Sequence, residues 1–533
     1  MNIAEQSGQS PATGSHGSVS NDRIEAFLRS KQNLIVAAIC ACAFLRILIF
    51  CAGFPLFNTL DEQDHLETVR NYSRGMVPGK ASPLSDPDMA RVFALYGSPE
   101  YLISRQRLHA VGMDVPVPEL APQVREVQFE RRFNYWLTQP VTEAQSPPVY
   151  YAVAGVWYKL GALLGIKDWA LAYWVRFLNA ILYGVFIWIA FLFVREVYQQ
   201  NTFLCVAVPG LLAVFPQDVF FGANRDILSP LLVTVALLLL FRAIEKEKDG
   251  RLELVAGGAV TGLAFLTDVS NFVLFGVLTA VLYVLARKNI QHEKVRRDFW
   301  AIGVGALAAA LPPVLWMARN RAVTGDLTGS KAKIAYLAWT VKPWGDFWQH
   351  PIFTLHGAGY FLREVILKYW RGELVWQGTP MRSAITDGFY LISTCLLITV
   401  FAVHVVGRNE AEEHAPRERR LRFNGLVSLY LMAVSILFFW GGGAISLPFD
   451  FHECVYPSRQ KPYFLSGRII CGTLLPFAVI YAGGFEFLWR PLRRYVHPVI
   501  RFAVICVFIT GSEMLLRANV FHSAFNFFSL SGR

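Results

Sequence analysis

The acidic stretch at residues 54–67 holds the residues of this chain that are best suited to acid–base chemistry. It reads Phe-Pro-Leu-Phe-Asn-Thr-Leu-Asp-Glu-Gln-Asp-His-Leu-Glu and directly follows an apolar segment. On a helix, Asp61 and His65 share one face, while Glu62 is turned away by about 100°. Partial burial would raise the pKa of a carboxylate such as Asp61, which could then act as a general base toward a hydroxyl or an amine. The alternative is a solvated acidic loop that caps the following helix.

A second candidate is the turn at residues 215–226, which reads Phe-Pro-Gln-Asp-Val-Phe-Phe-Gly-Ala-Asn-Arg-Asp and directly precedes an apolar segment. Asp226 stands where it could face a cavity at a membrane border. The alternative is a plain helix N-cap, a position that Asp fills well. Asp218, Asn224 and Arg225 belong to the same turn and could line a cavity there.

Basic and aromatic side chains gather in two further stretches, residues 356–382 and 450–468. Arginine suits the recognition of a phosphate, and aromatic rings can stack on sugar faces. The alternative is anchoring of Trp and Arg at a membrane interface. The basic candidates are Arg363, Arg371, Arg459 and Arg468. Arg468 opens an apolar segment, where a charge requires a partner.

The composition is that of a polytopic membrane protein. Of the 533 residues, 54% are hydrophobic and 17% are charged, whereas soluble domains carry about a quarter charged residues. The net charge of +11 could suggest nucleic-acid binding. Most Lys and Arg residues stand in short loops between apolar segments, which is the positive-inside pattern of membrane proteins. We therefore expect membrane lipids, and no nucleic acid, as partners. The eight cysteines show no CxxC or metal-ligand spacing, so a structural metal site is not predicted.

About eleven membrane spans are predicted, at residues 33–54, 173–194, 202–221, 226–241, 252–267, 271–286, 299–317, 387–407, 424–441, 468–488 and 497–516. A further apolar segment at residues 146–161 is short and rich in Tyr and Trp, which favours a helix lying on the outer leaflet. The competing interpretation is another full span. Keeping this helix outside places nearly every basic cluster on the cytoplasmic side. Arg46, inside the first span, should face protein or extend toward the interface.

This topology predicts four parts of the chain. We expect a disordered cytoplasmic tail at 1–31 and a transmembrane core at 32–317 that includes a first outer loop at 55–170. A second outer loop follows at 318–386. The C-terminal spans occupy 387–533 and enclose a third outer loop at 442–467.

The order of these motifs resembles the GT-C superfamily of polytopic glycosyltransferases, in particular protein O-mannosyltransferases and the lipid A aminoarabinose transferase. The resemblance covers about residues 33–290. It rests on Asp61-Glu62, Pro147-Pro148-Val-Tyr-Tyr, Val175-Arg-Phe-Leu-Asn-Ala, Asn224-Arg-Asp226 and Gly262-Leu-Ala-Phe-Leu-Thr. Ser466-Gly-Arg468 with Pro476 looks like the C-terminal signature of some bacterial relatives.

The resemblance implies an all-α GT-C-like bundle with helices and loops on its outer face. It implies transfer of a sugar, with inversion, from a polyprenyl-phosphate donor to a glycan, lipid or protein acceptor. The site would face the periplasm from the cell inner membrane, and the N-terminus would be cytoplasmic. Asp61 and Asp226 would be catalytic. Substrate-binding candidates are Glu62, His65, Tyr150, Asn224, Arg225, Arg363, Arg371, Arg459 and Arg468. A divalent cation could be held by Asp61, Asp64 and His65.

One position departs from the pattern, because many relatives have Lys where this chain has Asp268. The departure leaves open an altered donor or a non-catalytic relative. Another alternative is a transporter or flippase for a lipid-linked glycan, a class that commonly shows broken spans in repeated halves. The transferase hypothesis requires Asp61, Asp226 and a loop arginine to meet at a common outer site.

Overall fold

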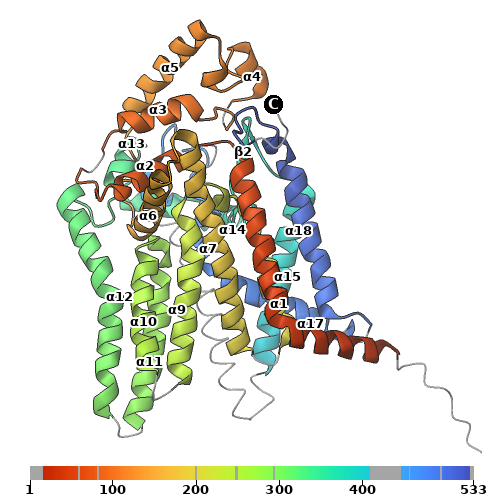
Figure 1. The fold of residues 1–533 in the computed structure, drawn as a ribbon. Helices are drawn as coiled ribbons and strands as arrows, with labels where there is room; N and C mark the ends of the chain where they lie inside the picture. The colour runs from red at the N-terminus through yellow and green to blue at the C-terminus, as the bar shows by residue number, and fades with distance from the viewer. Residues whose placement is uncertain are drawn as a thin grey trace, which may run out of the picture.

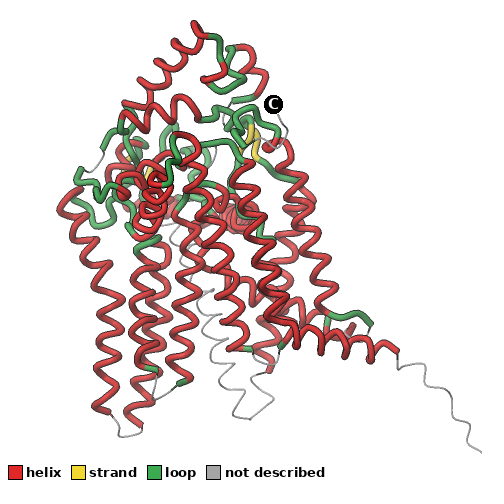
Figure 2. Tube along the Cα trace, in the orientation of Figure 1, coloured by secondary structure: helices red, strands yellow, loops and turns green. Residues whose placement is uncertain are grey.

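The structure is a computed structural model that describes residues 16–57, 61–80, 83–101, 103–198, 201–246, 250–291, 295–408, 446–454, 457–492 and 495–528. It is a bundle of long helices with a layer of short helices and loops at one end (Figures 1 and 2). In the described part, strands are limited to two short antiparallel pairs. Thr340–Val341 (β1) pairs with Phe449–Asp450 (β4), and Val375–Trp376 (β2) pairs with Thr379–Pro380 (β3). The prediction of an all-α polytopic membrane protein is confirmed.

Eight helices in the described part are long and apolar enough to cross a membrane. They are α1 (His16–Gly53), α7 (Asp168–Val197), α9 (Leu228–Glu245), α11 (Leu274–Gln291), α12 (Val295–Thr324), α15 (Ala384–Arg408), α17 (Leu474–Leu488) and α18 (Pro498–Phe521). Two other predicted spans are shorter helices, α8 (Thr202–Ala213) and α10 (Arg251–Phe265). The predicted span at 424–441 lies outside the described residues. The predicted count of eleven is therefore not confirmed.

The short α10 packs between α9 and α12 because glycines line its contact face. A Cβ at Gly258 would stand 2.1 Å from the carbonyl oxygen of Gly305, and one at Gly262 would stand 2.7 Å from that of Ala309. Small residues four positions apart let two helix backbones approach closely within a membrane. This packing fixes the end of α10, which leads directly to Asp268.

The layer at the upper end of Figure 1, called the cap layer here, carries the short helices. It consists of α2 (Glu62–Ser73), α3 (Pro87–Tyr96), α4 (Arg105–Ala110), α5 (Pro122–Leu137), α6 (Val149–Leu163), α13 (Lys331–Tyr336) and α14 (Leu355–Arg371). Local signals set several of their ends. Asp86 accepts a hydrogen bond from the Asp88 amide at the start of α3, where Pro87 occupies the first turn. Thr354 caps α14 in the same way, through the amide of Gly357.

Helix α6 is the Tyr-rich segment that was expected to lie on the membrane surface. It has 15 residues and lies across the upper end of the long helices (Figure 1). Tyr150 and Tyr151 are buried toward the protein, while Val156 and Leu163 are 73% and 77% exposed on the opposite side. An amphipathic helix of this kind suits the interface better than a full span.

Two expectations about the first helix have different outcomes. The predicted disordered tail at 1–31 is wrong from residue 16 onward, because α1 begins at His16. Ile24, Phe27 and Leu28 recur at helical spacing there, and Leu28 is buried. The prediction that Arg46 faces protein is confirmed. Arg46 donates to Glu513 of α18 at 2.9 and 2.6 Å, and Arg517 contacts the same carboxylate.

Candidate active site

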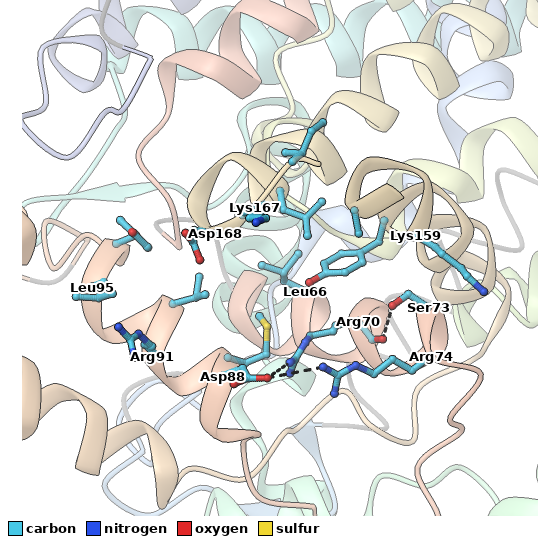
Figure 3. A pocket seen from close by; sticks show the side chains of 18 residues that line it. Leu66, Arg70, Ser73, Arg74, Asp88, Arg91, Leu95, Lys159, Lys167 and Asp168 are labelled. Carbon is cyan, nitrogen blue, oxygen red and sulfur yellow. Dashed lines mark hydrogen bonds and ion pairs between the residues drawn. The ribbon is translucent and has the colours of Figure 1, made fainter. Parts of the chain in front are cut away.

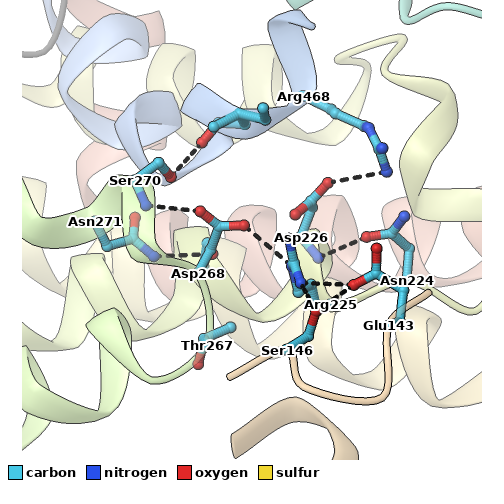
Figure 4. Close-up of polar contacts among 12 residues, drawn as sticks. Glu143, Ser146, Asn224, Arg225, Asp226, Thr267, Asp268, Ser270, Asn271 and Arg468 are labelled. Atoms are coloured by element: carbon cyan, nitrogen blue, oxygen red, sulfur yellow. Dashed lines mark hydrogen bonds and ion pairs between the residues drawn. The ribbon is translucent and has the colours of Figure 1, made fainter. Parts of the chain in front are cut away.

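Seven charged side chains of alternating sign form a continuous series, the ion chain, where the cap layer meets the long helices. In order they are Asp226, Arg468, Asp61, Lys333, Glu143, Arg225 and Asp268. They come from six separate places in the sequence, and Figure 4 shows the part around Arg225, Asp226 and Asp268. With four carboxylates and three basic groups, the full series carries a formal charge of −1. Alternation lets so many charges lie together at the border of a low-dielectric region.

One half of the series is loosely held. Arg468 lies 3.6 Å from Asp226 through Nη1 and 3.5 Å from Asp61 through Nη2, and the Lys333 ammonium lies 3.6 Å from Asp61. These distances exceed those of close charge-assisted hydrogen bonds, which are about 2.7–2.9 Å. Asp61, Arg468 and Lys333 are also 31%, 19% and 35% exposed. This open half leaves its cations accessible to another anion.

The other half is tightly held and mostly buried. Glu143 accepts from Lys333 at 2.7 Å and from Arg225 at 2.8 Å, and Asp268 accepts from Arg225 at 3.1 Å. The carboxylates of Glu143 and Asp268 are only 4% and 6% exposed. Burial alone would raise the pKa of Glu143, but Lys333 and Arg225 hold that pKa well below its usual value. The closed half therefore holds Lys333 and Arg225 in place.

Backbone geometry places Asp61 at the open half. It occupies the N-cap position of α2 with φ 60° and ψ 13°, and its side chain makes no capping hydrogen bond. The alternative interpretation of Asp61 as a simple helix cap is therefore not supported. A non-glycine residue with a left-handed backbone is uncommon, although Asp and Asn tolerate it better than most. The carboxylate is instead directed toward Lys333 and Arg468.

The expected pKa of Asp61 requires correction. Burial was predicted to raise it, and burial does act in that direction. However, the charges of Lys333 and Arg468 outweigh burial and lower the pKa below its ordinary value. Asp61 is thus ionised at neutral pH, as a general base must be, but it is a weak proton acceptor while both cations face it.

Asp226 meets Arg468 without acting as a helix cap. The cap of this turn is Asn224, whose side chain accepts from the Asp226 amide at 2.9 Å. Asp226 is 5% exposed and faces the guanidinium of Arg468 (Figure 4). The predicted residues Asp61, Asp226 and Arg468 therefore meet, and Asn224 holds the backbone beneath them. The predicted residue Arg225 lies next to them, in the closed half.

Asp268 has a defined role in this arrangement. It accepts from Arg225, and its other carboxylate oxygen accepts from the Ser270 amide at 2.8 Å (Figure 4). A lysine at this position would place two like charges together beside Arg225. The acidic residue is consistent with its surroundings, and the basic contacts of the open half come from Arg468 and Lys333.

Glu62 does not belong to the ion chain, contrary to its prediction as a substrate-binding residue. Its carboxylate is 2% exposed and accepts from Nε and Nη2 of Arg176, each at 2.6 Å. The amides of Phe57 and Ala223 also donate to it, each at 2.9 Å. Because Glu62 is turned about 100° from Asp61 on the helix, it faces α7 and fastens α2 to the long helices.

His65 and Tyr150 are also enclosed. His65 is 1% exposed, and its Nδ1 lies 2.8 Å from the Tyr151 hydroxyl. Burial lowers the pKa of His65 to about 4, so the ring is neutral at physiological pH. Tyr150 is fully buried and packs edge-on against Tyr151. Both predicted residues support the site from behind and do not face its open half.

Three predicted arginines lie apart from the ion chain. Arg371 donates to Asp387 at 2.9 Å, and Arg459 donates to Asp450 at 2.8 Å. Arg363 is on the exposed side of α14. The structure does not bring these side chains to Asp61 or Asp226, so their assignment as binding residues is not supported.

The residues suggested for a divalent cation are not assembled as ligands. Asp64 accepts from the Thr142 hydroxyl at 2.6 Å, and His65 faces Tyr151. Burial raises the pKa of Asp64 to about 8, with Asp61 and Glu143 adding to the effect. Within the described residues there is no group of three or more His, Cys, Asp or Glu side chains that could hold a metal ion.

Sequence reasoning missed Glu143 and Lys333. Glu143 stands a few residues before the Pro147-Pro148 motif, and Lys333 is in the second outer loop. Their charged partners are distant in the sequence, so periodicity could not identify them. Proximity to the proline motif was the one available signal for Glu143.

Comparison with known families gives one clear match. Residues 44–444 match the family described as "Predicted membrane protein (DUF2142)". The chain belongs to this family. No curated protein matches it.

The resemblance of the chain to solved structures is distant. One such structure is ArnT from Cupriavidus metallidurans bound to undecaprenyl phosphate, at 14% identity and a TM-score of 0.37, covering 87% of this chain and 73% of ArnT. Another is the oligosaccharyltransferase AglB from Archaeoglobus fulgidus, in complex with an inhibitory peptide and a dolichol-phosphate. It is 12% identical with a TM-score of 0.40, and the match covers 95% of this chain and 56% of AglB. Both are GT-C glycosyltransferases, the superfamily that the sequence resembles. A likeness of this degree assigns no activity.

Proposed function

We propose that this DUF2142 protein is an inverting membrane glycosyltransferase that moves a sugar from a polyprenyl-phosphate donor to an acceptor at the outer face of the cell inner membrane. The observation that carries the proposal is the meeting of Asp61, Asp226 and Arg468 at the open half of the ion chain. A base candidate, a second carboxylate and two accessible cations are what such a transfer requires.

In the proposed reaction, an acceptor hydroxyl or amine attacks the anomeric carbon from the face opposite the phosphate. The new bond forms as the bond from the anomeric carbon to the phosphate oxygen breaks, so the configuration inverts. Asp61 receives the acceptor proton. The bonding electrons remain with the polyprenyl phosphate, and Arg468 and Lys333 stabilise its additional negative charge. Asp226 orients Arg468 through their contact.

The same cations connect donor binding to the strength of the base. In the unliganded site, Lys333 and Arg468 lower the pKa of Asp61. A donor phosphate that engages these cations offsets their effect on the carboxylate. Binding then raises the pKa of Asp61 and makes it a better proton acceptor only when the donor is in place.

The distribution of basic residues supports the proposed orientation. Arg195, Arg242 and Arg287 lie near those ends of α7, α9 and α11 that are farther from the cap layer. Under the positive-inside rule, that end faces the cytoplasm. The cap layer and Asp61 then face the periplasm, and the N-terminus is cytoplasmic.

The proposal is tested with the full chain reconstituted in vesicles and supplied with synthetic polyprenyl-phosphate monosaccharides and hydroxyl or amine acceptors. Mass spectrometry measures released polyprenyl phosphate and glycosylated acceptor, and NMR determines the anomeric configuration of the product. We expect acceptor-dependent release with inversion, lost in Asp61→Asn and retained in the control Arg459→Gln. Turnover that is unchanged in Asp61→Asn, or donor crossing the bilayer with its sugar intact, would contradict the proposal.

A further inference from the structure

A basic cavity lies at the other end of α2, away from Asp61. It has a volume of about 600 Å³ and is bounded by α2, α3, α6 and the start of α7 (Figure 3). Asp61 precedes α2, whereas Arg70, Ser73 and Arg74 line the cavity from its last turns. The 12 residues of α2 span about 18 Å. None of the seven residues of the ion chain lines this cavity.

Positive charge dominates the cavity wall. Its lining includes five basic side chains, Arg70, Arg74, Arg91, Lys159 and Lys167, against two acidic ones, Asp88 and Asp168. The remainder is largely apolar and includes Leu66, Met89 and Leu171. A pocket with basic groups beside an apolar wall matches a ligand that has an anionic head and a hydrocarbon part.

Two of the basic residues are held in place. Arg70 donates to Asp86 at 2.6 Å and to Asp88 at 2.5 Å, and Arg74 lies 3.6–3.7 Å from the same carboxylates. Lys159 and Lys167 are exposed and make no ion pair with any residue that the structure describes. The arginines thus form a fixed wall, and the lysines are available for an incoming anion.

The cavity stands at the level expected for lipid headgroups. Asp168, in its lining, is the first residue of the α7 span. Helix α6 exposes Val156, Leu160 and Leu163 on its outer side, at 73%, 43% and 77%. Apolar exposure of this kind is suited to contact with lipid chains. Lys159 of the same helix therefore lies between a hydrocarbon-facing surface and the basic cavity.

We propose that this cavity binds the phosphate-bearing headgroup of an anionic membrane lipid. The phosphate contacts Lys159 and Lys167 beside the fixed wall of Arg70 and Arg74, and the acyl chains follow the exposed side of α6. Phosphate recognition by clustered Lys and Arg, together with burial of hydrocarbon, favours such a lipid over a zwitterionic one. The proposal concerns a site separate from the ion chain and does not depend on glycosyl transfer.

The test is native mass spectrometry of the detergent-purified full chain after incubation with phosphatidylglycerol or phosphatidylcholine. We expect the wild type to retain phosphatidylglycerol preferentially. The double variant Lys159→Gln/Lys167→Gln should lose at least tenfold in retention, about 1.4 kcal/mol. Ala162→Trp fills the cavity from α6 without changing charge and should have a similar effect.

The matched control is Arg105→Gln/Arg107→Gln, which removes two exposed positive charges from α4 outside the cavity. It should bind phosphatidylglycerol like the wild type. Equal retention by the Lys159/Lys167 variant and the wild type would overturn the proposal, as would equal losses in variant and control. Inorganic phosphate is tested separately by calorimetry. Binding of phosphate that depends on Lys159 and Lys167, without retention of phosphatidylglycerol, would identify a soluble anion instead and overturn the lipid assignment.

Discussion

Substitution of the adjacent residues Asp61 and Glu62 should have opposite consequences for activity and stability. The two carboxylates are neighbours in the sequence, but one lies in the open half of the ion chain and the other is paired with Arg176. We predict that Asp61→Asn strongly reduces transfer while the protein remains folded. We predict that Glu62→Gln mainly destabilises the fold.

The expected loss of stability in Glu62→Gln follows from the four hydrogen bonds that Glu62 accepts. Each carboxylate oxygen accepts two of them, one from Arg176 and one from a backbone amide, those of Ala223 and Phe57. Glutamine replaces one oxygen with an NH₂ group, so two buried donors lose their acceptor, at about 1–3 kcal/mol each. Arg176 is fully buried and also loses its counter-charge. The total agrees with the loss of about 3–5 kcal/mol seen when one partner of a buried ion pair is removed.

The expected cost at Asp61 is much smaller. Its contacts with Lys333 and Arg468 are 3.6 and 3.5 Å long, and the side chain is 31% exposed. Removing such a pair costs about 0–1 kcal/mol, and Asn tolerates the left-handed backbone at φ 60° well. Loss of a general base should nevertheless reduce transfer by about 10²–10⁴-fold.

Two measurements on the same preparations separate these effects. Stability is read from the fraction that stays monodisperse on fluorescence-detected gel filtration after stepwise heating. Activity is read as polyprenyl phosphate released per folded molecule. Glu62→Gln should lower the melting temperature by several degrees, and Asp61→Asn should leave it nearly unchanged. Wild-type stability in Glu62→Gln, or transfer within threefold of wild type in Asp61→Asn, would refute the roles assigned here.

Three further predictions follow from individual contacts. Arg468→Lys keeps the positive charge, but a lysine has no planar fork with which to contact both Asp61 and Asp226. Transfer should therefore fall about 10²-fold. The exposed control Arg459→Lys should stay near wild type in the same assay. Because burial raises the pKa of Asp64 to about 8 in the folded protein, its contribution to stability is complete below pH 4 and is lost as pH rises through 8. The melting temperature of Asp64→Asn relative to wild type should therefore be higher at pH 8.5 than at pH 5. Gly372→Ala should destabilise the protein, because the φ of Gly372 is +80° and an added Cβ would lie 1.9 Å from the Asp218 carboxylate. The control Gly359→Ala should not, because the space around its added Cβ is open.

Each of these three predictions can be contradicted by a specific result. Equal transfer by Arg468→Lys and Arg459→Lys would show that the two-sided contact of Arg468 is unimportant. A pH-independent difference between Asp64→Asn and wild type would contradict titration of that carboxyl group. Wild-type melting of Gly372→Ala would contradict the close approach of its turn to residue 218.

The sequence was sufficient to predict the helical bundle and to name Asp61, Asp226 and Arg468, which the fold brings together. It did not distinguish Arg468 from the other candidates Arg363, Arg371 and Arg459. Those predictions depended on strong signals, namely long apolar segments, charges at their borders and the order of motifs along the chain. Glu62, which was also named as a substrate-binding candidate, lies away from these residues for a geometric reason. A residue next to Asp61 on a helix faces another direction, and only the fold reveals that Arg176 lies there.

Glu143 and Lys333 illustrate what sequence patterns could not provide. They approach each other to 2.7 Å although 190 positions separate them in the chain. Neither periodicity nor local spacing carries information about such a contact. The same limit applies to the pKa of Asp61, whose direction depends on two cations from distant segments rather than on burial alone.

The ion chain also determines where an anionic ligand can enter. In the closed half, Arg225 is bound by the buried carboxylates of Glu143 and Asp268 at 2.8 and 3.1 Å, so an incoming phosphate would have to displace strong contacts. In the open half, Arg468 lies 3.5 Å from Asp61, and a phosphate can approach it from solvent. Lys333 lies 3.6 Å from Asp61 and is 35% exposed, although Glu143 also holds it at 2.7 Å. Replacing Asp268 with lysine would attract the anion toward Arg225, away from Asp61. The acidic residue that departs from the superfamily pattern therefore favours binding of the donor phosphate beside the proposed base.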